Sequence, residues 1–472
     1  MKTKKAFPGY NYLKKTKTWN AKVSSLCFLF LIVLFSSCQK EIKSNVVQQP
    51  LIAANHKDEI TISNFKKISS NMVLTWNDAA TVAVTRMAPF TGSGPLPPMP
   101  ESRIYAMVFV AMHDALNSIH PKYERYALTG PIESHASPDA AVAQAAHDVI
   151  IALLPPQQAY ADSLLNASLN SIPNGNAKTK GIDVGKASAA AMIAKRQNDG
   201  VATAQFNLPQ GTLPGQYRST PPFDGPPFNG FMAVPGWGNI TPFSLNSGNA
   251  FRPAPPYAVN SPEYTQDFNE IKSLGSSTSV TRTADQTQIA LFWLENAPLG
   301  WNRIARNLSM QRNMGAWESA RLFALLQIAE ADANIAALNA KYFYLYWRPI
   351  TAVRLGDSDG NPNTQGDPTW DVLAPPTPPV PDYPSNHAVN GGAASELIEE
   401  FFHHDHIAFS ATSSSLPNVT RSFTSLSQAA NENALSRIYV GYHFRHAVIE
   451  GTRQGEKIGL YVSQHSLRPL EE

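Results

Sequence analysis

Helical patterning along almost the whole chain, with little strand-like alternation, is the feature that most constrains the fold. The strongest helical segment runs from Ala316 through Lys341. Further helices are predicted at 102–119, 138–154, 181–196, 388–402 and roughly 426–464, with Ser102 and Ser137 as N-caps of the first two. Because each apolar helix face must be covered by another element, the sequence predicts an all-α fold of packed helical bundles.

Two long irregular stretches interrupt these helices. Residues 201–262 are dense in Pro, Gly and aromatic residues, as in the run Pro221–Phe228, and residues 356–384 are again rich in Pro and Gly. Loops of this length in a compact domain are usually functional or disordered. Because aromatic residues are interleaved with the prolines, we expect the first stretch to form an ordered wrap over the surface, at the rim of an active site.

Length and charge limit the classes of protein that the chain can represent. Its 472 residues are enough for a large core, and charged residues make up only 16% of them. The formal net charge is only +2, whereas nucleic-acid-binding domains usually carry a strongly basic patch. We therefore expect no nucleic-acid partner.

The N-terminus has the composition of a secretory signal. A Lys-rich start precedes the apolar run Leu26–Phe35, which is too short to span a bilayer comfortably and ends in Ser36-Ser37-Cys38. This pattern resembles a bacterial lipoprotein signal, in which Cys38 would become the lipidated first residue; an ordinary cleaved signal is the alternative. We expect an exported cell-envelope lipoprotein, periplasmic or at the cell surface, held to the membrane through Cys38. The predicted organisation is a signal peptide over 1–37, a polar tether over 38–68 and a helical domain over 69–472.

Three short segments near the C-terminus together supply the groups needed to hold a tetrahedral oxyanion. They are Lys341 to Arg348-Pro349, then Pro384-Ser385-Asn386-His387, then Ser436-Arg437 followed by His443. Lys341 and Arg348 are seven residues apart, and we expect both to lie on one face of one helix. Since an unpaired buried charge is very costly, such a pair needs an anion, and Arg binds oxyanions in a bidentate manner.

The second and third segments add backbone, hydroxyl and imidazole groups. Ser385 is expected to cap a helix that begins near Ala388, whose first-turn N–H groups can bind an anion, with His387 placed to exchange protons. Arg437 and His443 do not share a face of an ideal helix, so Gly441 or a helix start must adjust the geometry. His443 could then act as a nucleophile or as a ligand to a metal oxyanion.

In this order, the segments resemble the type 2 phosphatidic acid phosphatase and vanadium haloperoxidase superfamily. Its signature is Lys-x6-Arg-Pro, then Pro-Ser-Gly-His, then Ser-Arg-x5-His-x3-Asp. The surrounding residues resemble the vanadium haloperoxidase branch, and the likeness covers roughly 70–465. These residues are 331–333, 346–349, 383–385, 432–437 and 441–445, with 102–103 and 112–115 upstream. The resemblance implies a domain of that helical-bundle type, with its catalytic motifs between 341 and 447.

The resemblance also implies roles for individual residues. The vanadate oxygens would be held by Lys341, Arg348, Ser385, Arg437 and the backbone N–H of Asn386. His443 would be the axial ligand to vanadium, His387 the acid–base residue, and Lys341 the main source of polarisation of bound peroxide. The chain would then oxidise halide with hydrogen peroxide, using vanadate as cofactor. The halide, any small organic substrate and the oligomeric state are left open.

Four positions bear on this resemblance. Asn386 replaces the usual Gly, which adds bulk and changes the accessible backbone angles. Ala447 replaces the Asp that orients the nucleophilic His in phosphatases; Glu450 is a hypothetical substitute on the same helical face. Val380 stands where chloride-type relatives carry an aromatic residue, so the halide preference is open.

Two alternative functions follow from these departures. An acid phosphatase would need no vanadate: His443 would attack phosphorus and form a phospho-His intermediate, and His387 would protonate the leaving group. The loss of Asp at Ala447 counts against this reaction. A non-catalytic oxyanion-binding lipoprotein is the third hypothesis, motivated by Asn386 and Ala447 together.

Other polar clusters favour structural explanations. His403-His404-Asp405-His406 could bind a transition metal, but a helix C-terminus favours histidines there without one. Asp357–Asn361 hints at calcium, yet Pro362 and the misplaced Gly favour a turn. His113 and Asp114 are predicted to be helix-packing polar groups. For Asp332, pairing with a site arginine is one of two open possibilities.

Overall fold

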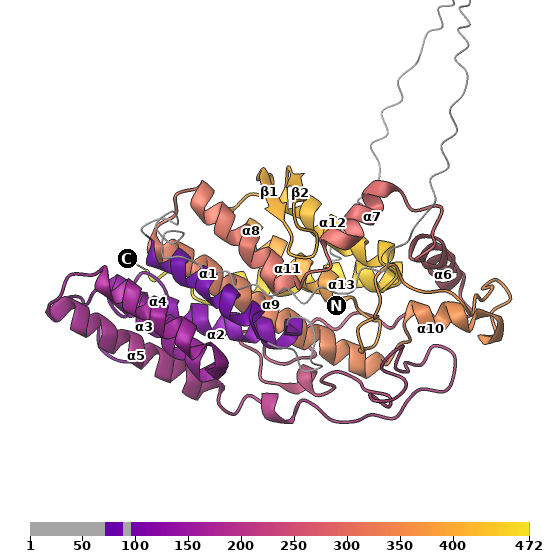
Figure 1. Ribbon diagram of the computed structural model, residues 1–472, viewed down its shortest axis with the longest axis horizontal. Coiled ribbons are helices and arrows are strands. Elements are labelled where there is room, and N and C mark those ends of the chain that lie inside the picture. The colour runs from indigo at the N-terminus through magenta and orange to yellow at the C-terminus, as the bar shows by residue number, and fades with distance from the viewer. Residues whose placement is uncertain (1–70, 88–95, 472) are drawn as a thin grey trace, which may run out of the picture. The chain divides into compact units, whose positions relative to one another are not determined.

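The computed structural model describes residues 71–87 and 96–471, all within the second of the chain's two units, Ile60–Glu472 (Figure 1). The predicted signal peptide, the tether and Cys38 lie outside the described residues. The helices are α1 (Met72–Thr85), α2 (Pro98–Asn117), α3 (Pro138–Leu153), α4 (Gln158–Asn170), α5 (Asn176–Arg196), α6 (Pro262–Leu274), α7 (Ala284–Phe292), α8 (Ala297–Gln311), α9 (Ala316–Tyr344), α10 (Pro349–Arg354), α11 (Asn386–Phe402), α12 (Leu426–Tyr439) and α13 (Arg445–His465). None of these described helices is both long and apolar enough to cross a membrane.

The prediction of an all-α fold is confirmed. Within the described ranges the only sheet is a two-stranded antiparallel hairpin of β1 (Phe409–Thr412) and β2 (Thr420–Phe423). Phe409 pairs with Phe423 at its open end and both rings are buried. The hairpin lies beside the helices and takes no part in forming the site.

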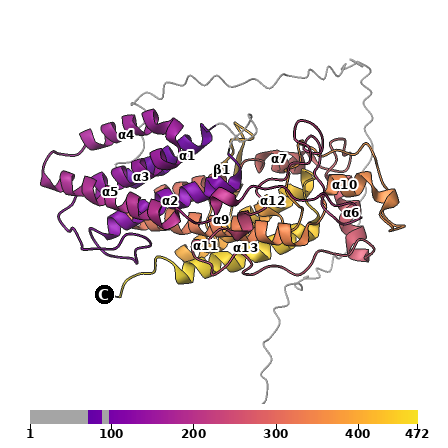
Figure 2. The same ribbon diagram turned by 90° about the horizontal axis from the view of Figure 1, so that it is seen from below.

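Helix α9 joins two groups of helices (Figures 1 and 2). On one side it packs against α2, which in turn packs against α3 and α5; on the other it packs against α11, which contacts α12 and α13. Almost every residue of α9 from Ser319 to Lys341 is buried. A helix that is apolar on all sides must be enclosed by other elements, so this segment runs through the middle of the fold.

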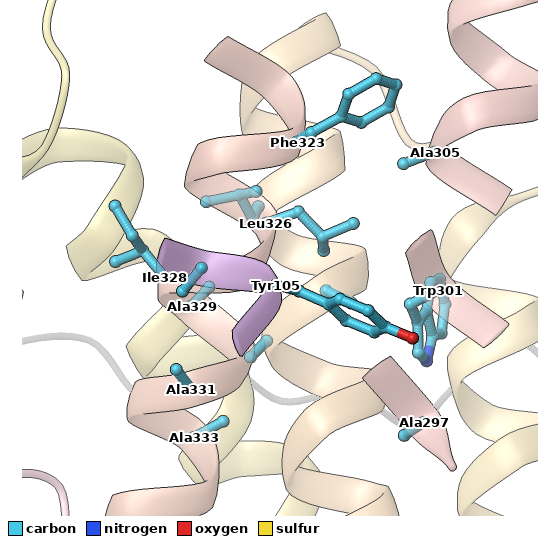
Figure 3. Close-up of a cluster of buried hydrophobic side chains, with 14 of the residues drawn as sticks. Tyr105, Ala297, Trp301, Ala305, Phe323, Leu326, Ile328, Ala329, Ala331 and Ala333 are labelled. Carbon is cyan, nitrogen blue, oxygen red and sulfur yellow. The ribbon is translucent and has the colours of Figure 1, made fainter. Parts of the chain in front are cut away.

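The core between α2, α8 and α9 combines large aromatic rings with small alanines. Figure 3 shows Tyr105 of α2 pointing toward Trp301 of α8, with Phe323 and a row of Ala side chains on α9. Tyr105 and Trp301 are both 0% exposed. Since burial of one large apolar side chain stabilises a fold by about 1.5–3 kcal/mol, this region holds α9 firmly in place.

Several predicted helix boundaries are wrong, and the helix predicted over 181–196, for example, begins at Asn176. Helix α2 begins at Pro98 rather than at Ser102, because proline is well suited to a first helical turn; Ser102 instead donates a 3.0 Å hydrogen bond to the carbonyl of Met99. The helix predicted over 426–464 is divided by a turn at 440–444, where Gly441 has a φ of +90°. The N-cap predicted at Ser137 is confirmed, since its hydroxyl accepts from the N–H of Ala140.

The aromatic stretch 201–262 forms the expected ordered wrap, and it packs on the segments that carry the candidate site residues. The N–H of Tyr217 donates to the carbonyl of Leu345 at 2.7 Å, and the N–H of Trp347 donates to Gly215 at 3.0 Å. Three tyrosine hydroxyls donate to carbonyls of this stretch: Tyr344 to Pro253, Tyr346 to Tyr257 and Tyr383 to Ala254. The aromatic residues after Lys341 therefore fasten this wrap to the site.

Candidate oxyanion site

Lys341 and Arg348 come from two different elements. Lys341 lies in the last turn of α9, which ends because Leu345 adopts a left-handed conformation with φ of +47°. Arg348 is the N-cap of α10, and Pro349 is the first residue of that helix. The prediction that one helix carries both side chains is therefore wrong, because the chain turns at Leu345. Both side chains are nevertheless buried, at 0% and 1% exposure.

Both cations hold the chain segment just before Ser385. Lys341 Nζ donates to the carbonyls of Pro381 at 2.6 Å and Asp382 at 2.8 Å. Arg348 Nε donates to the carbonyl of Val380 at 2.7 Å, and its Nη1 donates to the carbonyl of Tyr442 at 2.9 Å. Arg348 thus links this segment to the turn that carries His443.

The charges of the buried cations are poorly neutralised. Burial, reinforced by the positive charge of Arg348, holds the pKa of Lys341 well below its usual value, and burial lowers the pKa of Arg437 to about 10. Arg348 has one carboxylate in reach, Asp382 at 3.9 Å. Among the described residues, neither Lys341 nor Arg437 has a carboxylate within ion-pair distance. Such a cluster favours the binding of an anion.

The N-terminus of α11 supplies a free hydroxyl. Ser385 is the N-cap of this helix, which begins at Asn386 rather than near Ala388. The Ser385 side chain does not cap the helix as predicted, and its Oγ has no hydrogen-bond partner among the described residues although it is buried. This hydroxyl and the first-turn N–H groups are therefore available to an anion.

Asn386 is compatible with this helix start. It lies in the first turn of α11 and is not among the residues with positive φ, so the backbone does not require glycine here. Its Nδ2 donates to Asn334 Oδ1 of α9 at 3.0 Å, and Asn334 in turn donates to Ser102 Oγ at 3.1 Å. The extra side chain is therefore held between α9 and α11.

His387 has a partner that the sequence reasoning missed. Its Nδ1 lies 3.3 Å from Oδ1 of Asn433 on α12. Burial and the charge of Arg437 hold the pKa of His387 well below its usual value, so the ring is neutral at pH 7. Asn433 is four residues before Arg437 on the same helix, and this spacing places both on one face. That spacing is the signal that could have identified Asn433.

His443 lies in the turn between α12 and α13, and Gly441 provides the expected adjustment. The N–H groups of Tyr442 and His443 both donate to the carbonyl of Arg437, which closes the turn. A Cβ on Gly441 would lie 2.6 Å from the carbonyl oxygen of Gly275, so only glycine fits. The ring of His443 is thereby brought to Arg348, whose Nη1 is 3.0 Å from His443 Nε2. Burial and nearby cations, Arg348 first, hold the pKa of His443 well below its usual value.

Asp382 is the second residue of the site that sequence reasoning missed. Its Oδ1 lies 2.9 Å from His443 Nδ1, and the side chain is 0% exposed. Burial raises the pKa of Asp382 to about 7, although the charges of Arg348 and Lys341 oppose this rise. The suggested substitute, Glu450, pairs instead with Arg453 at 2.6 Å, so that suggestion is wrong. A carboxylate between Pro381 and Pro384, three residues before Ser385, could have drawn attention to it.

Two further acidic residues hold loops rather than site cations. Asp332 accepts hydrogen bonds from the N–H groups of residues 243–245, at 2.6 to 2.8 Å, so it does not pair with a site arginine. Asp114 accepts from the N–H groups of residues 126–128, and His113 Nδ1 lies 3.3 Å from its Oδ1. The structural explanation for His113 and Asp114 therefore holds.

The two suspected metal sites are helix and turn features. His403 ends α11 in a left-handed conformation, and Asp405 caps α12 by accepting from the N–H and hydroxyl of Ser427. Asp359 accepts from the N–H of Asn361 and the hydroxyl of Thr364 within its own loop. No group of three or more His, Cys, Asp or Glu residues in the described parts of the chain could hold a metal ion.

The residues brought together fit a tetrahedral oxyanion. Lys341, Arg348 and Arg437 supply buried positive charge, and the hydroxyl of Ser385 and Nε of Arg437 have no partner among the described residues. His443 Nε2 lies at the guanidinium of Arg348. The unused donors and the excess charge are the two properties that binding of an oxyanion would satisfy.

Comparisons with known proteins point to one group. Residues 321–472 match the family described as the VCPO second helical-bundle domain. The chain is 26% identical to vanadium chloroperoxidase of Curvularia inaequalis over 500 aligned positions, which cover 80% of this chain and 79% of that protein.

Solved structures extend this likeness to the three-dimensional fold. A bacterial vanadium-dependent iodoperoxidase has a TM-score of 0.71 and 25% sequence identity, covering 84% of this chain and 98% of its own. The holo form of a bacterial vanadium-dependent chloroperoxidase shares the fold at a TM-score of 0.63 and 18% identity, covering 82% and 95% of the two chains. The likeness therefore spans most of each chain rather than the site motifs alone.

Proposed function

We propose that this chain, which belongs to the vanadium haloperoxidase branch predicted from its motifs, oxidises halide with hydrogen peroxide at a vanadate held by the oxyanion site. The observation that carries this proposal is the cluster of buried cations beside His443. Lys341 and Arg437 lack carboxylate partners among the described residues, and Arg348 contacts the imidazole directly. The named activities of the similar proteins support the same reaction.

Both charged side chains and neutral hydrogen-bond donors would bind the vanadate. Lys341, Arg348 and Arg437 would neutralise the vanadate oxygens, while Ser385 Oγ and the N–H of Asn386 would donate hydrogen bonds to them. His443 would provide Nε2 as the ligand to vanadium, since its Nδ1 faces Asp382. When bound, vanadate supplies Lewis-acid activation of hydrogen peroxide without a change in its own redox state.

His387 would act as the acid–base residue. Its depressed pKa keeps the ring neutral at pH 7, so a ring nitrogen can accept a proton from hydrogen peroxide as the peroxide binds. Asn433, 3.3 Å from Nδ1, would hold the ring in position. Lys341 would place a hydrogen-bond donor beside the position where hydrogen peroxide is activated.

The decisive experiment compares two activities in the same purified protein. Oxidation of bromide and iodide by hydrogen peroxide is assayed with and without added vanadate, beside hydrolysis of a phosphomonoester. We expect halide oxidation that depends on vanadate and is abolished in His443→Ala. Halide oxidation that ignores vanadate, or ester hydrolysis alone, would disprove the proposal, and full activity in His443→Ala would show that the site is elsewhere.

Phosphomonoester hydrolysis is a second candidate because of one observation. Alanine stands at position 447, where phosphatases carry the carboxylate that orients the nucleophilic histidine. Asp382 nevertheless brings a carboxylate within 2.9 Å of the ring of His443. In that case phosphate esters would occupy the site without vanadate, His443 would attack phosphorus and His387 would protonate the leaving group. The ester assay above distinguishes this candidate.

We also propose that the chain is exported and anchored through a lipid on Cys38. The support is the Lys-rich start, the short apolar run Leu26–Phe35 and the small residues before Cys38. Incorporation of labelled fatty acid into the wild type but not into Cys38→Ser would support this proposal. Equal labelling of both, or of neither, would contradict it.

A further inference from the structure

The carboxylate of Asp382 and the imidazole of His443 form a close pair inside the protein. Asp382 Oδ1 lies 2.9 Å from His443 Nδ1, and the two side chains are 0% and 5% exposed. The nearest cation to this carboxylate is Arg348, at 3.9 Å, so the imidazole is the closest of its ionisable neighbours. In surroundings of low dielectric constant such a pair is strongly coupled.

The backbone of Asp382 is held on both sides, which makes the position of its side chain reproducible. The carbonyl of Asp382 accepts from Lys341 Nζ at 2.8 Å, and its N–H donates to the carbonyl of Tyr346 at 2.9 Å. These contacts come from the end of α9 and the segment that follows it. The carboxylate is therefore fixed by the same elements that position Lys341 and Arg348.

A guanidinium also lies against the ring of His443. Arg348 Nη1 is 3.0 Å from Nε2 and 3.4 Å from Nδ1, so this contact alone does not select a tautomer. The carboxylate of Asp382 lies only at Nδ1, and a carboxylate only accepts hydrogen bonds, so it favours the tautomer with the proton on Nδ1.

A small cavity lies against the carboxylate of Asp382. It has a volume of about 10 Å³ and is lined by Asp382, Ala447, Tyr264, Asp267 and His446, among others. That volume holds about one water molecule. Ala447 and Asp382 both line this cavity, so a carboxylate at either position would face the same space.

We propose that Asp382 is the positioning residue of His443, replacing the carboxylate that is missing at Ala447. Its Oδ1, which is 2.9 Å from Nδ1 and has no hydrogen-bond partner among the described residues, would accept a hydrogen bond from Nδ1–H and so keep the lone pair of Nε2 directed at the bound oxyanion. Carboxylates that orient a metal-bound histidine in this way commonly change anion or metal affinity by 10–100-fold. The expected effect on vanadate rests on the proposed function, whereas the tautomer of His443 does not.

The first test measures the tautomer in the full chain without vanadate. The protein is labelled with 15N-histidine, long-range 15N–1H spectra are recorded, and the His443 signals are assigned from their loss in His443→Gln. We expect the Nδ1–H tautomer in the wild type. The Nε2–H tautomer, or a mixture of both, would overturn the proposal without any variant having to fold.

The second test compares variants of similar size. Asp382→Asn should give mixed tautomers and bind orthovanadate about ten-fold or more weakly by calorimetry, with unchanged circular dichroism. Asp267→Asn, which lines the same cavity but does not contact His443, should match the wild type in both measurements. Recovery of orthovanadate binding in Asp382→Ala/Ala447→Asp, relative to Asp382→Ala, would show that the carboxylate itself is needed.

Two outcomes separate this proposal from the proposed function. If Asp382→Asn keeps the wild-type tautomer and the wild-type orthovanadate affinity, Asp382 does not position His443, whatever the protein catalyses. If the wild type shows no vanadate-dependent halide oxidation but has the Nδ1–H tautomer, and loses it in Asp382→Asn, the haloperoxidase assignment fails and the positioning role stands.

Discussion

Lys341 donates a 2.8 Å hydrogen bond to the main-chain carbonyl of Asp382, so the cation at the end of α9 fixes the segment that leads into α11. The same ammonium group donates to the carbonyl of Pro381 at 2.6 Å. Lys341 therefore holds the backbone on which Asp382 and Ser385 depend, in addition to its proposed role in binding the oxyanion.

Replacement of Lys341 should affect both binding and stability. In Lys341→Met the carbonyls of Pro381 and Asp382 lose their donor, which should cost about 1–3 kcal/mol of unfolding free energy. Affinity for orthovanadate should fall at least ten-fold because a buried cation is lost. Calorimetry and urea unfolding test these effects, with Lys272→Met as the matched control. Lys272 is half-buried and donates to the carbonyl of Gln365. Equal orthovanadate affinity in Lys341→Met and the wild type would exclude Lys341 from the site.

Gly441 should tolerate no side chain, and Gly360 offers a matched control. Both have positive φ, +90° for Gly441 and +85° for Gly360. A Cβ at Gly441 would lie 2.6 Å from the carbonyl oxygen of Gly275, whereas a Cβ at Gly360 would have no heavy atom within 4 Å. Gly360→Ala should cost about 1–2 kcal/mol from backbone strain alone. Gly441→Ala should cost more in urea unfolding and should also weaken orthovanadate binding, since His443 follows the turn. Similar losses of unfolding free energy in the two variants would show that the surroundings of Gly441 move to accommodate the added Cβ.

Glu101 should make the fold less stable as pH rises. Burial raises its pKa from 4.5 to about 8, so between these values the unfolded chain releases a proton that the folded chain keeps. Each pKa unit between the folded and unfolded values corresponds to about 1.4 kcal/mol, so the unfolding free energy should fall by several kcal/mol from pH 4 to pH 8. Glu101→Gln should remove this loss, leaving the variant more stable than the wild type at pH 8 and similar to it at pH 4.

Urea unfolding across this pH range measures the effect, and Glu124 provides a control of opposite sign. Its hydrogen bond to Arg468 lowers the pKa of Glu124, so ionisation of this carboxylate favours the folded state. Glu124→Gln should therefore be slightly less stable than the wild type at pH 8. A parallel pH dependence in Glu101→Gln and the wild type would contradict the prediction.

His147 should stabilise the fold at low pH. Its Nδ1 lies 2.7 Å from Asp148 and its Nε2 lies 2.8 Å from Asp162, which ties α3 to α4. Burial alone would lower its pKa, but hydrogen bonds to Asp148 and Asp162 outweigh burial and raise it. The stabilisation is therefore fully present below the unfolded pKa of 6.5 and is lost as pH rises through the higher folded value.

Asp162→Asn should show this pH dependence directly. The variant should be less stable than the wild type by about 1 kcal/mol at pH 5.5, and the difference should shrink by pH 9. Thermal unfolding at both pH values measures it, with the exposed Asp183 of α5, changed to Asn, as control. A difference that stays constant with pH would show that His147 is not the group responsible.

Much of the helical fold could be predicted because helix signals are local. The pattern from Ala316 to Lys341 forms most of α9, and the N-cap at Ser137 is where expected. The failures occur at single residues. The turns at Leu345 and Gly441 depend on single residues with positive φ, and for a leucine that conformation is imposed by the surrounding contacts rather than by its own preference.

For the site, the sequence by itself determined which chemical groups are present and in what order: Lys341, Arg348, Ser385, His387, Arg437 and His443. Their types and order predict an oxyanion site, and the resemblance of the three segments to the vanadium haloperoxidase branch predicts that the oxyanion is vanadate. Only the tertiary structure decided the partners of the two imidazoles, Asn433 for His387 and Asp382 for His443. Those pairs join segments far apart in the chain, and they form only after α9, α11 and α12 have packed together. Local spacing can show that Asn433 shares a helix face with Arg437, but it does not give the distance between segments far apart in the chain, because packing sets that distance.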